Sequence, residues 1–422
     1  MAGDSPLVTD MAVAAGRMAM HGAHETILLA GGLVILSILA AIASRRIGAP
    51  MLLAFLALGM LAGEDGPLGI AFSDYTTSYL IGSVALAVIL FEGGLKTPVS
   101  MLREAFWPSL VLATLGVAVT AAIVGAVVAL LDGLPLVPSL LAGAVVAPTD
   151  AAAVAVLLRS QETLIPKRLS ALLEVESGLN DPMSVFLTFL LIHLIVAPGT
   201  LGAFGAVALF LEAMLGGALL GLAGGWLIGR AMRLLPLEPA LATVFLLGAA
   251  LGLFGLAQLV GASGFLSVYM AGILTRALAS PAGSDDIAPF FESMAWLSQV
   301  VLFLMLGLLA TPHLLPSYIP GAIGGAAALI FLARPVAVFA TLLPFRFSWR
   351  EAAFSSWVGL RGAVPIYLSI IPALGDPERG GNLFASIFIV VILSLVVQGW
   401  TVGLSARLLG FSGRREEAGS RV

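Results

Sequence analysis

Long apolar runs follow one another along almost the whole chain, and short clusters of charged residues, proline and glycine separate them. A run of about 17–25 apolar residues is long enough to cross a bilayer as a helix. The pattern therefore predicts an all-α membrane protein with thirteen spans. The spans are expected near 27–44, 48–64, 78–95, 107–131, 137–158, 168–196, 203–230, 239–259, 263–279, 289–310, 319–343, 350–371 and 383–409.

Composition excludes a soluble fold of this size. The chain has 422 residues, of which 60% are hydrophobic and only 10% charged, and its mean hydropathy is +1.08. Its 20 basic and 24 acidic residues cannot cover the surface of a soluble protein. The absence of cysteine excludes disulfides, thiolate metal sites and cysteine nucleophiles. The protein is thus expected to be polytopic in the membrane.

The two ends of the chain carry no membrane span. Residues 1–26 lack a long apolar run and are expected to form an N-terminal arm that is disordered or lies on the surface. The first apolar run is followed by Arg45 and Arg46, whereas a signal peptide carries its positive charge before the apolar region. This run is therefore a retained span. Residues 410–422 are expected to form a cytoplasmic tail.

Basic residues fall almost entirely on one side of the membrane when the thirteen spans are threaded. One side receives 16 of the 20 lysines and arginines, whereas the other receives Arg17 and Arg379, and Arg334 and Arg361 lie within spans. Such an excess marks the cytoplasmic side. The sequence thus predicts an outside N-terminus and a cytoplasmic C-terminus. The 16 residues are Arg45, Arg46, Lys96, Arg103, Arg159, Lys167, Arg168, Arg230, Arg233, Arg276, Arg346, Arg350, Arg407, Arg414, Arg415 and Arg421.

An odd number of spans suits inverted repeats of six that are joined by a linker helix. The fifth span is interrupted at Pro148-Thr149-Asp150, and the twelfth at residues 359–365, which include Arg361 and Pro365. These are corresponding positions in the two halves. Paired discontinuous spans of this kind indicate a transport site near the middle of the bilayer.

Two aspartates lie within apolar spans where a charge is costly. Asp150 follows Pro148-Thr149, and Asp181 precedes Pro182, with Asn180 beside it and Ser177 one helical turn earlier. A charge in the bilayer core costs about 2.5–3.5 kcal/mol on insertion scales, so acids that occur there usually serve an ion or proton pathway. The simpler alternatives are that Asp150 caps a helix and that Asn180 and Asp181 form a structural hydrogen-bond network.

These oxygens could hold an alkali cation. Carboxylates, a hydroxyl and the carbonyls of a broken helix are hard ligands suited to Na⁺ or K⁺. Burial also disfavours the charged form of a carboxylate, so a proton can compete with the cation for the same group. The predicted site is therefore one that is loaded with either a monovalent cation or a proton, with Asp150, Ser177 and Asp181 as its side-chain ligands.

A third intramembrane acid, Glu176, lies five residues before Asp181 and points to another face of the helix. It needs a cationic partner, and only Arg334 and Arg361 lie within spans. We favour a structural Glu176–Arg334 pair that joins the sixth and eleventh spans. Arg361 is then expected to offset helix C-terminal dipoles or the local acidic charge.

Together these residues make the chain resemble monovalent cation/proton antiporters of the branch with Asn-Asp in the sixth span. The resemblance covers nearly the whole sequence, and its motifs are specific in combination. Within the branch, the chain is most similar to bacterial potassium/proton antiporters linked to cell-volume regulation. The resemblance rests on the stretches 44–50, 59–67, 149–153, 174–178, 180–183 and 357–365.

The resemblance implies a homodimer in the inner membrane of a bacterium. Spans within 107–196 and 319–409 would form a moving core, and those within 27–95 and 203–310 a dimerisation scaffold. The family's ion site carries over to Asp150, Ser177, Asp181 and the carbonyl of Thr149. Exchange is expected to be electroneutral, since Asn180 adds no titratable group.

One departure concerns the C-terminus. The relatives that this chain most resembles continue into a cytoplasmic regulatory domain, whereas this sequence stops at Val422. We expect either a truncated sequence or a member without that regulation.

Three other classes of protein were weighed against the antiporter. A channel would fit the broken helices, but no filter-like repeat of threonine, glycine and tyrosine occurs. A sodium-coupled solute symporter could use the same kind of fold and is the main alternative. An intramembrane enzyme is disfavoured because there is no His-Glu-x-x-His motif, and neither aspartate lies in a Gly-x-Gly-Asp context. K⁺ or Na⁺, H⁺ and membrane lipid are the expected partners, with no cofactor and no nucleic acid.

Overall fold

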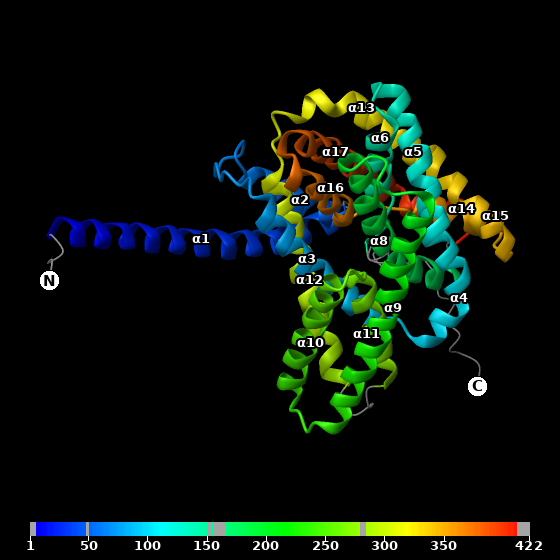
Figure 1. Ribbon diagram of the computed structural model, residues 1–422, viewed down its shortest axis with the longest axis horizontal. Helices are drawn as coiled ribbons and strands as arrows, with labels where there is room; N and C mark the ends of the chain where they lie inside the picture. The colour runs from blue at the N-terminus through cyan, green and yellow to red at the C-terminus, as the bar shows by residue number, and fades with distance from the viewer. Residues whose placement is uncertain (1–5, 48–49, 151–152, 155–164, 279–283, 412–422) are drawn as a thin grey trace.

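The computed structural model describes residues 6–47, 50–150, 153–154, 165–278 and 284–411, and these residues are built from helices (Figure 1). Within them, extended pairing is confined to an isolated bridge between Gly63 and Ile70. The α-helices are α1 (Pro6–Ile47), α2 (Met51–Ala62), α3 (Tyr75–Lys96), α4 (Val99–Val111), α5 (Val117–Asp132), α6 (Leu136–Val146), α8 (Lys167–Val196), α9 (Ala203–Leu234), α10 (Pro239–Leu259), α11 (Gly264–Leu278), α12 (Ser284–Leu309), α13 (Ile319–Ala328), α14 (Arg334–Leu342), α15 (Trp349–Trp357), α16 (Ala363–Gly375) and α17 (Pro377–Leu408).

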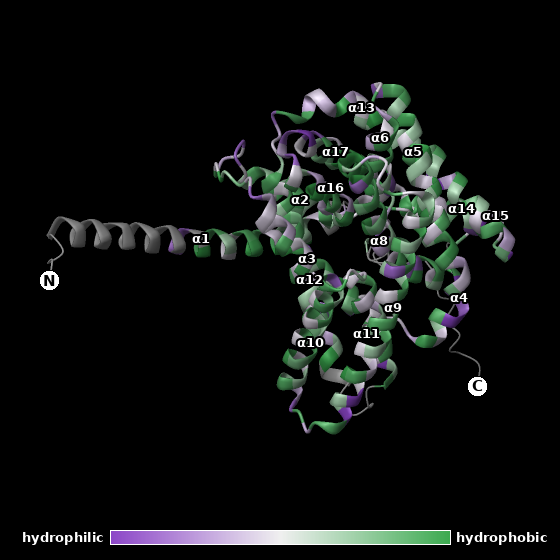
Figure 2. Cartoon of the chain, viewed as in Figure 1, coloured by the Kyte–Doolittle hydropathy of each residue, from purple (hydrophilic) through white to green (hydrophobic). Residues whose placement is uncertain are grey.

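The predicted membrane spans are confirmed as apolar helices. Among the described residues, nine helices are long and apolar enough to cross a membrane, and four shorter apolar helices complete the set. Each of these thirteen overlaps one predicted span, although in the fifth and twelfth spans the helix covers only part of the predicted range. Figure 2 shows apolar residues throughout the helices and hydrophilic residues gathered mostly in the connecting segments. The end of the fifth span, 155–158, and the tail from 412 onward lie outside the described residues.

Local signals at the helix ends explain where several helices begin. Asp74 caps α3, because its side chain accepts a hydrogen bond from the Thr77 amide at 3.0 Å. Ser348 and Glu351 form a reciprocal capping box at the start of α15. At α17, Asp376 caps the first turn. Such caps satisfy amides that have no partner within the helix.

Interruptions occur in pairs related by the inverted repeat. The fifth and twelfth spans are broken, as predicted: α6 ends before the non-helical residues 147–150, and residues 358–362 separate α15 from α16. The fourth and eleventh spans are continuous but contain π-helical segments, Leu112–Gly116 between α4 and α5 and Leu329–Ala333 between α13 and α14. The π segments had no sequence signal, yet they fall in corresponding spans of the two halves.

The N-terminal arm differs from the prediction of a disordered segment. Helix α1 runs without interruption from Pro6 to Ile47, so residues 6–26 continue the first span as helix. In Figure 1, α1 projects away from the other helices. The arm is rich in alanine and methionine, which favour helix even where no apolar face has to be buried.

The helices pack as two groups that meet along one boundary (Figure 1). Helices α1–α3 and α9–α12 contact mainly one another, and we call them the lateral bundle. Helices α4–α6, α8 and α13–α17 form the crossing bundle, which contains both broken spans. Contacts of α3 with α16 and of α11 with α8 join the two bundles.

Candidate functional site

The two broken spans meet directly. The amide of Asp150, the last residue of the first break, donates a 2.8 Å hydrogen bond to the carbonyl of Leu360 within the second break. Both breaks contain proline or glycine, and breaking a helix frees backbone groups that need new partners. Each break therefore supplies hydrogen-bond partners for backbone groups that the other break leaves free.

Arg361 closes the end of α6 from the opposite break. Its side chain is 1% exposed, and Nη1 donates to the carbonyls of Ala147 and Pro148 at 2.9 and 3.0 Å. These carbonyls continue the C-terminal end of α6, where the helix dipole places partial negative charge. The contacts fit the role predicted from sequence, in which Arg361 offsets a helix C-terminal dipole.

Two polar residues of α17 hold the second break in place, and the sequence analysis missed them. The Ser394 hydroxyl accepts a 3.2 Å hydrogen bond from the Arg361 amide and donates to Gln398 at 2.6 Å. Gln398 in turn donates to the carbonyl of Trp357, the last residue of α15, at 2.7 Å. Their signal was a pair of buried polar residues four apart, on one face of an otherwise apolar span.

Thr149 links the first break to α8. Its carbonyl accepts a 2.9 Å hydrogen bond from the Ser177 hydroxyl, and its own hydroxyl accepts one from the Asn180 amide nitrogen at 2.7 Å. Asn180 is fully buried and Thr149 is 7% exposed. The structure thus brings together three of the residues that the sequence singled out. The Ser177 oxygen keeps lone pairs that can face an ion.

Asp181 is buried beside this group. It is 8% exposed, and its Oδ1 atom accepts no hydrogen bond from the part of the chain that the structure describes. Asp150 is near enough for the two charges to interact. One oxygen of Asp150 accepts from the amide of Ala153 at 3.0 Å, so the capping alternative holds for that atom. A side chain at Gly362 would press on Asp150, with a Cβ only 2.9 Å from its Cγ.

Glu176 forms the predicted ion pair with Arg334. The guanidinium of Arg334 contacts both carboxylate oxygens, at 2.5 and 2.9 Å, and Glu176 and Arg334 are 0% and 3% exposed. Arg334 also reaches the carbonyl of Ser355 at 3.4 Å. The bidentate geometry matches the planar guanidinium to the carboxylate. This pair joins α8 to α14.

The described residues contain no cluster of three or more histidine, cysteine, aspartate or glutamate side chains that could hold a metal ion. The oxygens gathered at the crossing are those of Asp150, Thr149, Ser177 and Asp181. They are carboxylate, hydroxyl and carbonyl oxygens, which are the ligands that hard cations prefer.

Comparisons with known proteins agree with this geometry. Residues 33–407 match the family described as "Sodium/hydrogen exchanger, transmembrane". The K(+)/H(+) antiporter NhaP2 of Shewanella oneidensis is 44% identical over 384 residues, which cover 90% of this chain and 66% of the relative. The chain therefore spans about two thirds of that relative's length. The K(+)/H(+) antiporter NhaP of Alkalimonas amylolytica is 41% identical over 390 residues, 92% of this chain and 68% of its own.

A further relative is matched over its whole length. The Na(+)/H(+) antiporter NhaH of Halobacillus dabanensis is 27% identical over 413 residues, which cover 93% of this chain and 100% of the relative. The solved structure of the sodium proton antiporter MjNhaP1 from Methanocaldococcus jannaschii at pH 8 has the same fold, with a TM-score of 0.76 at 23% identity, covering 89% of this chain and 99% of that chain. With the family match spanning most of the sequence, the chain belongs to the sodium/hydrogen exchanger family.

Proposed function

We propose that this chain is a secondary antiporter that exchanges K⁺ or Na⁺ for H⁺, and that Asp181 carries both in turn. The observation that supports this most strongly is the Asp181 carboxylate, which is 8% exposed, lies near enough to Asp150 of the first break for their charges to interact, and leaves Oδ1 without a hydrogen bond from the described residues. A buried carboxylate in this position needs a bound cation or a proton to neutralise it. The printed names of the relatives above, which are K(+)/H(+) and Na(+)/H(+) antiporters, point the same way.

In the cation-loaded state, oxygens of Asp181, Asp150 and Ser177 and the carbonyl of Thr149 surround the ion. Ser177 already contacts the Thr149 carbonyl, so the hydroxyl, the carbonyl and the break are positioned before an ion arrives. Preorganised ligands lose less conformational entropy on binding. In the proton-loaded state, protonated Asp181 is neutral, so the site loses one of the charges that bind the cation. The two substrates therefore exclude each other.

The remaining charged groups hold the site without carrying substrate. Glu176 and Arg334 neutralise each other, Arg361 closes the end of α6, and Asn180 fixes Thr149 by a hydrogen bond. Asp150 positions Asp181 and the ion. One cation then exchanges for one proton, so the net charge moved in a cycle is zero.

The crossing bundle would move against the lateral bundle during the cycle, since both halves of the site lie within the crossing bundle. We further propose that the lateral bundle forms the contact of a homodimer. The protein would reside in the inner membrane of a bacterium with its N-terminus outside and its C-terminus in the cytoplasm. The predicted distribution of 16 against 2 basic residues supports that orientation.

Purified protein in liposomes with an imposed pH gradient tests this function. Adding K⁺ or Na⁺ alone should dissipate the gradient in the wild type, and a series of Li⁺, Na⁺, K⁺ and Rb⁺ identifies the preferred cation. Asp181→Asn should give no response, whereas Asp132→Asn, which changes an exposed aspartate at the end of α5, should behave as wild type. A wild type that ignores every salt unless an organic solute is present would instead favour the symporter.

A further inference from the structure

Two tyrosines cross the boundary between the bundles, and each ring lies on a glycine of the other bundle. Tyr367 of α16 reaches from the crossing bundle to Gly82 of α3. Tyr269 of α11 reaches in the opposite sense, from the lateral bundle to Gly178 of α8. Neither tyrosine belongs to the candidate ion site, yet together they account for close contacts between parts that would have to move.

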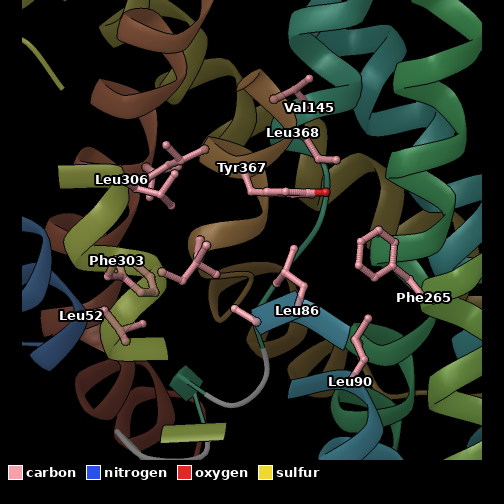
Figure 3. Close-up of a cluster of buried hydrophobic side chains, with 14 of the residues drawn as sticks. Leu52, Leu86, Leu90, Val145, Phe265, Phe303, Leu306, Tyr367 and Leu368 are labelled. Carbon is pink, nitrogen blue, oxygen red and sulfur yellow. The ribbon is translucent and has the colours of Figure 1, made fainter. Parts of the chain in front are cut away.

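Tyr367 is 1% exposed and is held by several groups of the lateral bundle. Its hydroxyl lies 2.8 Å from the Ser83 hydroxyl, and its ring stacks on Tyr79 with centroids 5.7 Å apart. The edge of Phe265 meets the same ring at 6.3 Å. Figure 3 shows Tyr367 within the buried apolar cluster that includes Phe265. A Cβ at Gly82 would lie 2.7 Å from Cε2 of Tyr367, so only glycine leaves room for the ring.

Tyr269 makes the matching contact on the other side of the boundary. It is 2% exposed, and a Cβ at Gly178 would lie 2.5 and 2.8 Å from its Cε2 and Cε1 atoms. Gly178 lies three residues before Asp181 on α8. The ring therefore covers the helix immediately next to the carboxylate proposed to carry the substrates.

The two contacts lie at different depths in the membrane, as their positions along α3 show. Tyr367 contacts α3 at Gly82, whereas the backbone of Tyr269 lies against Gly94. Twelve helical residues correspond to roughly 18 Å along the axis, more than half of the hydrocarbon thickness of about 30 Å.

The candidate site lies between these depths. The Thr97 hydroxyl at the far end of α3 donates to Glu174 of α8 at 3.2 Å, so the start of α8 is level with that end. Asp181 lies further along α8, away from it. Gly362 lies next to Asp150, just before α16 begins. Tyr367 comes five residues later on α16, on the side of the site that faces the beginning of α3. The site is thus bounded by the Tyr367 contact on one side and the Tyr269 contact on the other.

We infer that Tyr367 and Tyr269 are the two gates of the transport cycle, and that each ring must leave its glycine in turn to admit substrate from one side. The inference rests on the proposed antiport function and assigns it two positioning residues. An aromatic ring seated on a glycine packs without space for water, so it can seal a path. Sliding of one bundle against the other unseats one ring while the other stays closed.

A matched set of glycine substitutions tests each gate separately. Gly82→Ala places a methyl group against Tyr367, and Gly178→Ala places one against Tyr269. Gly93→Ala is the control, because it adds the same group to α3 where no atom lies within 4 Å. Hydrogen–deuterium exchange should rise roughly tenfold within 75–86 and 363–375 for Gly82→Ala, and within 167–178 and 264–278 for Gly178→Ala. Gly93→Ala should match wild type.

The sharper test removes both rings. Tyr269→Leu and Tyr367→Leu singly should keep coupled exchange with an altered KM, whereas the double variant should let cations cross without counter-moving protons, at a rate at least about tenfold above wild-type leak. Tyr367→Phe should open the Ser83 side by removing the hydroxyl bond, whereas Tyr269→Phe, whose hydroxyl has no hydrogen-bond partner among the described residues, should change little.

The outcomes separate the gates from the function. A wild type that exchanges cations for protons, with a folded double variant that stays tightly coupled, would overturn the gates. Hydrogen–deuterium exchange that rises equally around both tyrosine contacts in each glycine variant would also overturn the gates, since it would indicate a general loosening of the boundary. If wild type shows no exchange at all, the proposed function fails, while localised hydrogen-exchange changes would still support two separate closures.

Discussion

Helix α8 carries two buried acids whose surroundings are opposite. Glu176 is 0% exposed and both of its oxygens contact the guanidinium of Arg334. Asp181, five residues later, is 8% exposed and leaves Oδ1 without a hydrogen bond from the described residues. Five residues correspond to a net rotation of about 140° around the helix, so the two side chains face different neighbours. Glu176 faces Arg334 of α14, whereas Asp181 lies near enough to Asp150, in the first break, for their charges to interact.

The difference separates a charge that is fixed from one that is available. A buried acid with a built-in counter-ion is satisfied at all times and can only hold helices together. A buried acid whose charge the protein does not fully compensate must take up a cation or a proton from solution. The same helix therefore provides the scaffold of the site and its changeable group, and each can be broken separately.

The largest expected effect is that of Asp181→Asn. Neutralising this residue should abolish cation/proton exchange, because an amide in place of the Asp181 carboxylate can neither release a proton nor balance the charge of a cation. The thermal unfolding temperature at pH 7 should stay the same or rise, since the variant no longer buries an incompletely compensated carboxylate. Liposome flux and a melting curve on the same preparation measure both. Retained exchange, or a large loss of stability, would place Asp181 with Glu176 as a structural acid.

Glu176→Gln should have the opposite effect: it should lower the folding stability and leave cation/proton exchange in place. It leaves Arg334 as a lone buried charge, which costs about 3–5 kcal/mol of folding stability. Adding Arg334→Gln removes that charge and should recover part of the loss. Thermal denaturation of the two single variants and the double variant gives the coupling between them. Strictly additive losses would argue that the pair contributes no shared energy and would direct attention to Arg361.

A third acid, Asp65, lies at the surface and extends the comparison to an exposed carboxylate. The backbone amide of His313 donates to Asp65 at 2.7 Å, and this bond, together with the His313 ring, holds the pKa of Asp65 below its ordinary value of 3.8. A carboxylate with a lowered folded-state pKa contributes stability above its unfolded pKa and loses it as the pH falls through the folded one. Asp65→Asn should therefore melt slightly earlier at pH 7.

That small difference should disappear below the folded-state pKa, where wild-type Asp65 is protonated as well. Melting curves of wild type and Asp65→Asn between pH 7 and pH 3 follow it. A difference that persists once wild-type Asp65 is protonated would contradict the assignment of the contact as a stabilising one.

The smallest expected effect is that of the membrane potential, which should be zero. Electroneutral exchange moves no net charge, although each uncompensated charge would be worth about 2.3 kcal/mol per 100 mV. A valinomycin-clamped liposome assay, with sodium as substrate and a fixed pH gradient, varies the potential alone. A rate or end point that follows the potential would mean that a second proton travels, with Asp150 as its carrier.

Features encoded locally could be predicted from the sequence. The thirteen spans follow from the length of the apolar runs, and the two breaks from proline and glycine within them. The Glu176–Arg334 pair was predictable because so few basic residues lie within spans. The sequence left the N-terminal arm open as disordered or lying on the surface, and residues 6–26 are helical, which the absence of an apolar run does not exclude.

Features that depend on packing could not be predicted. The π segments, the support of the second break by Ser394 and Gln398, and the seating of Tyr367 on Gly82 arise when segments far apart in the chain meet. The sequence placed Ser177 at the site by its position one turn before Asp181 and the Thr149 carbonyl through the resemblance, and the structure adds that they contact each other at 2.9 Å.

Proton release on cation binding tests the central contrast most directly. Purified protein in a weakly buffered solution near pH 7 is mixed with K⁺ or Na⁺, and the protons released are counted. We predict a release from wild type and from Glu176→Gln/Arg334→Gln, and none from Asp181→Asn. Equal release from wild type and Asp181→Asn would show that the exchanged proton resides elsewhere and would contradict Asp181 as the shared carrier.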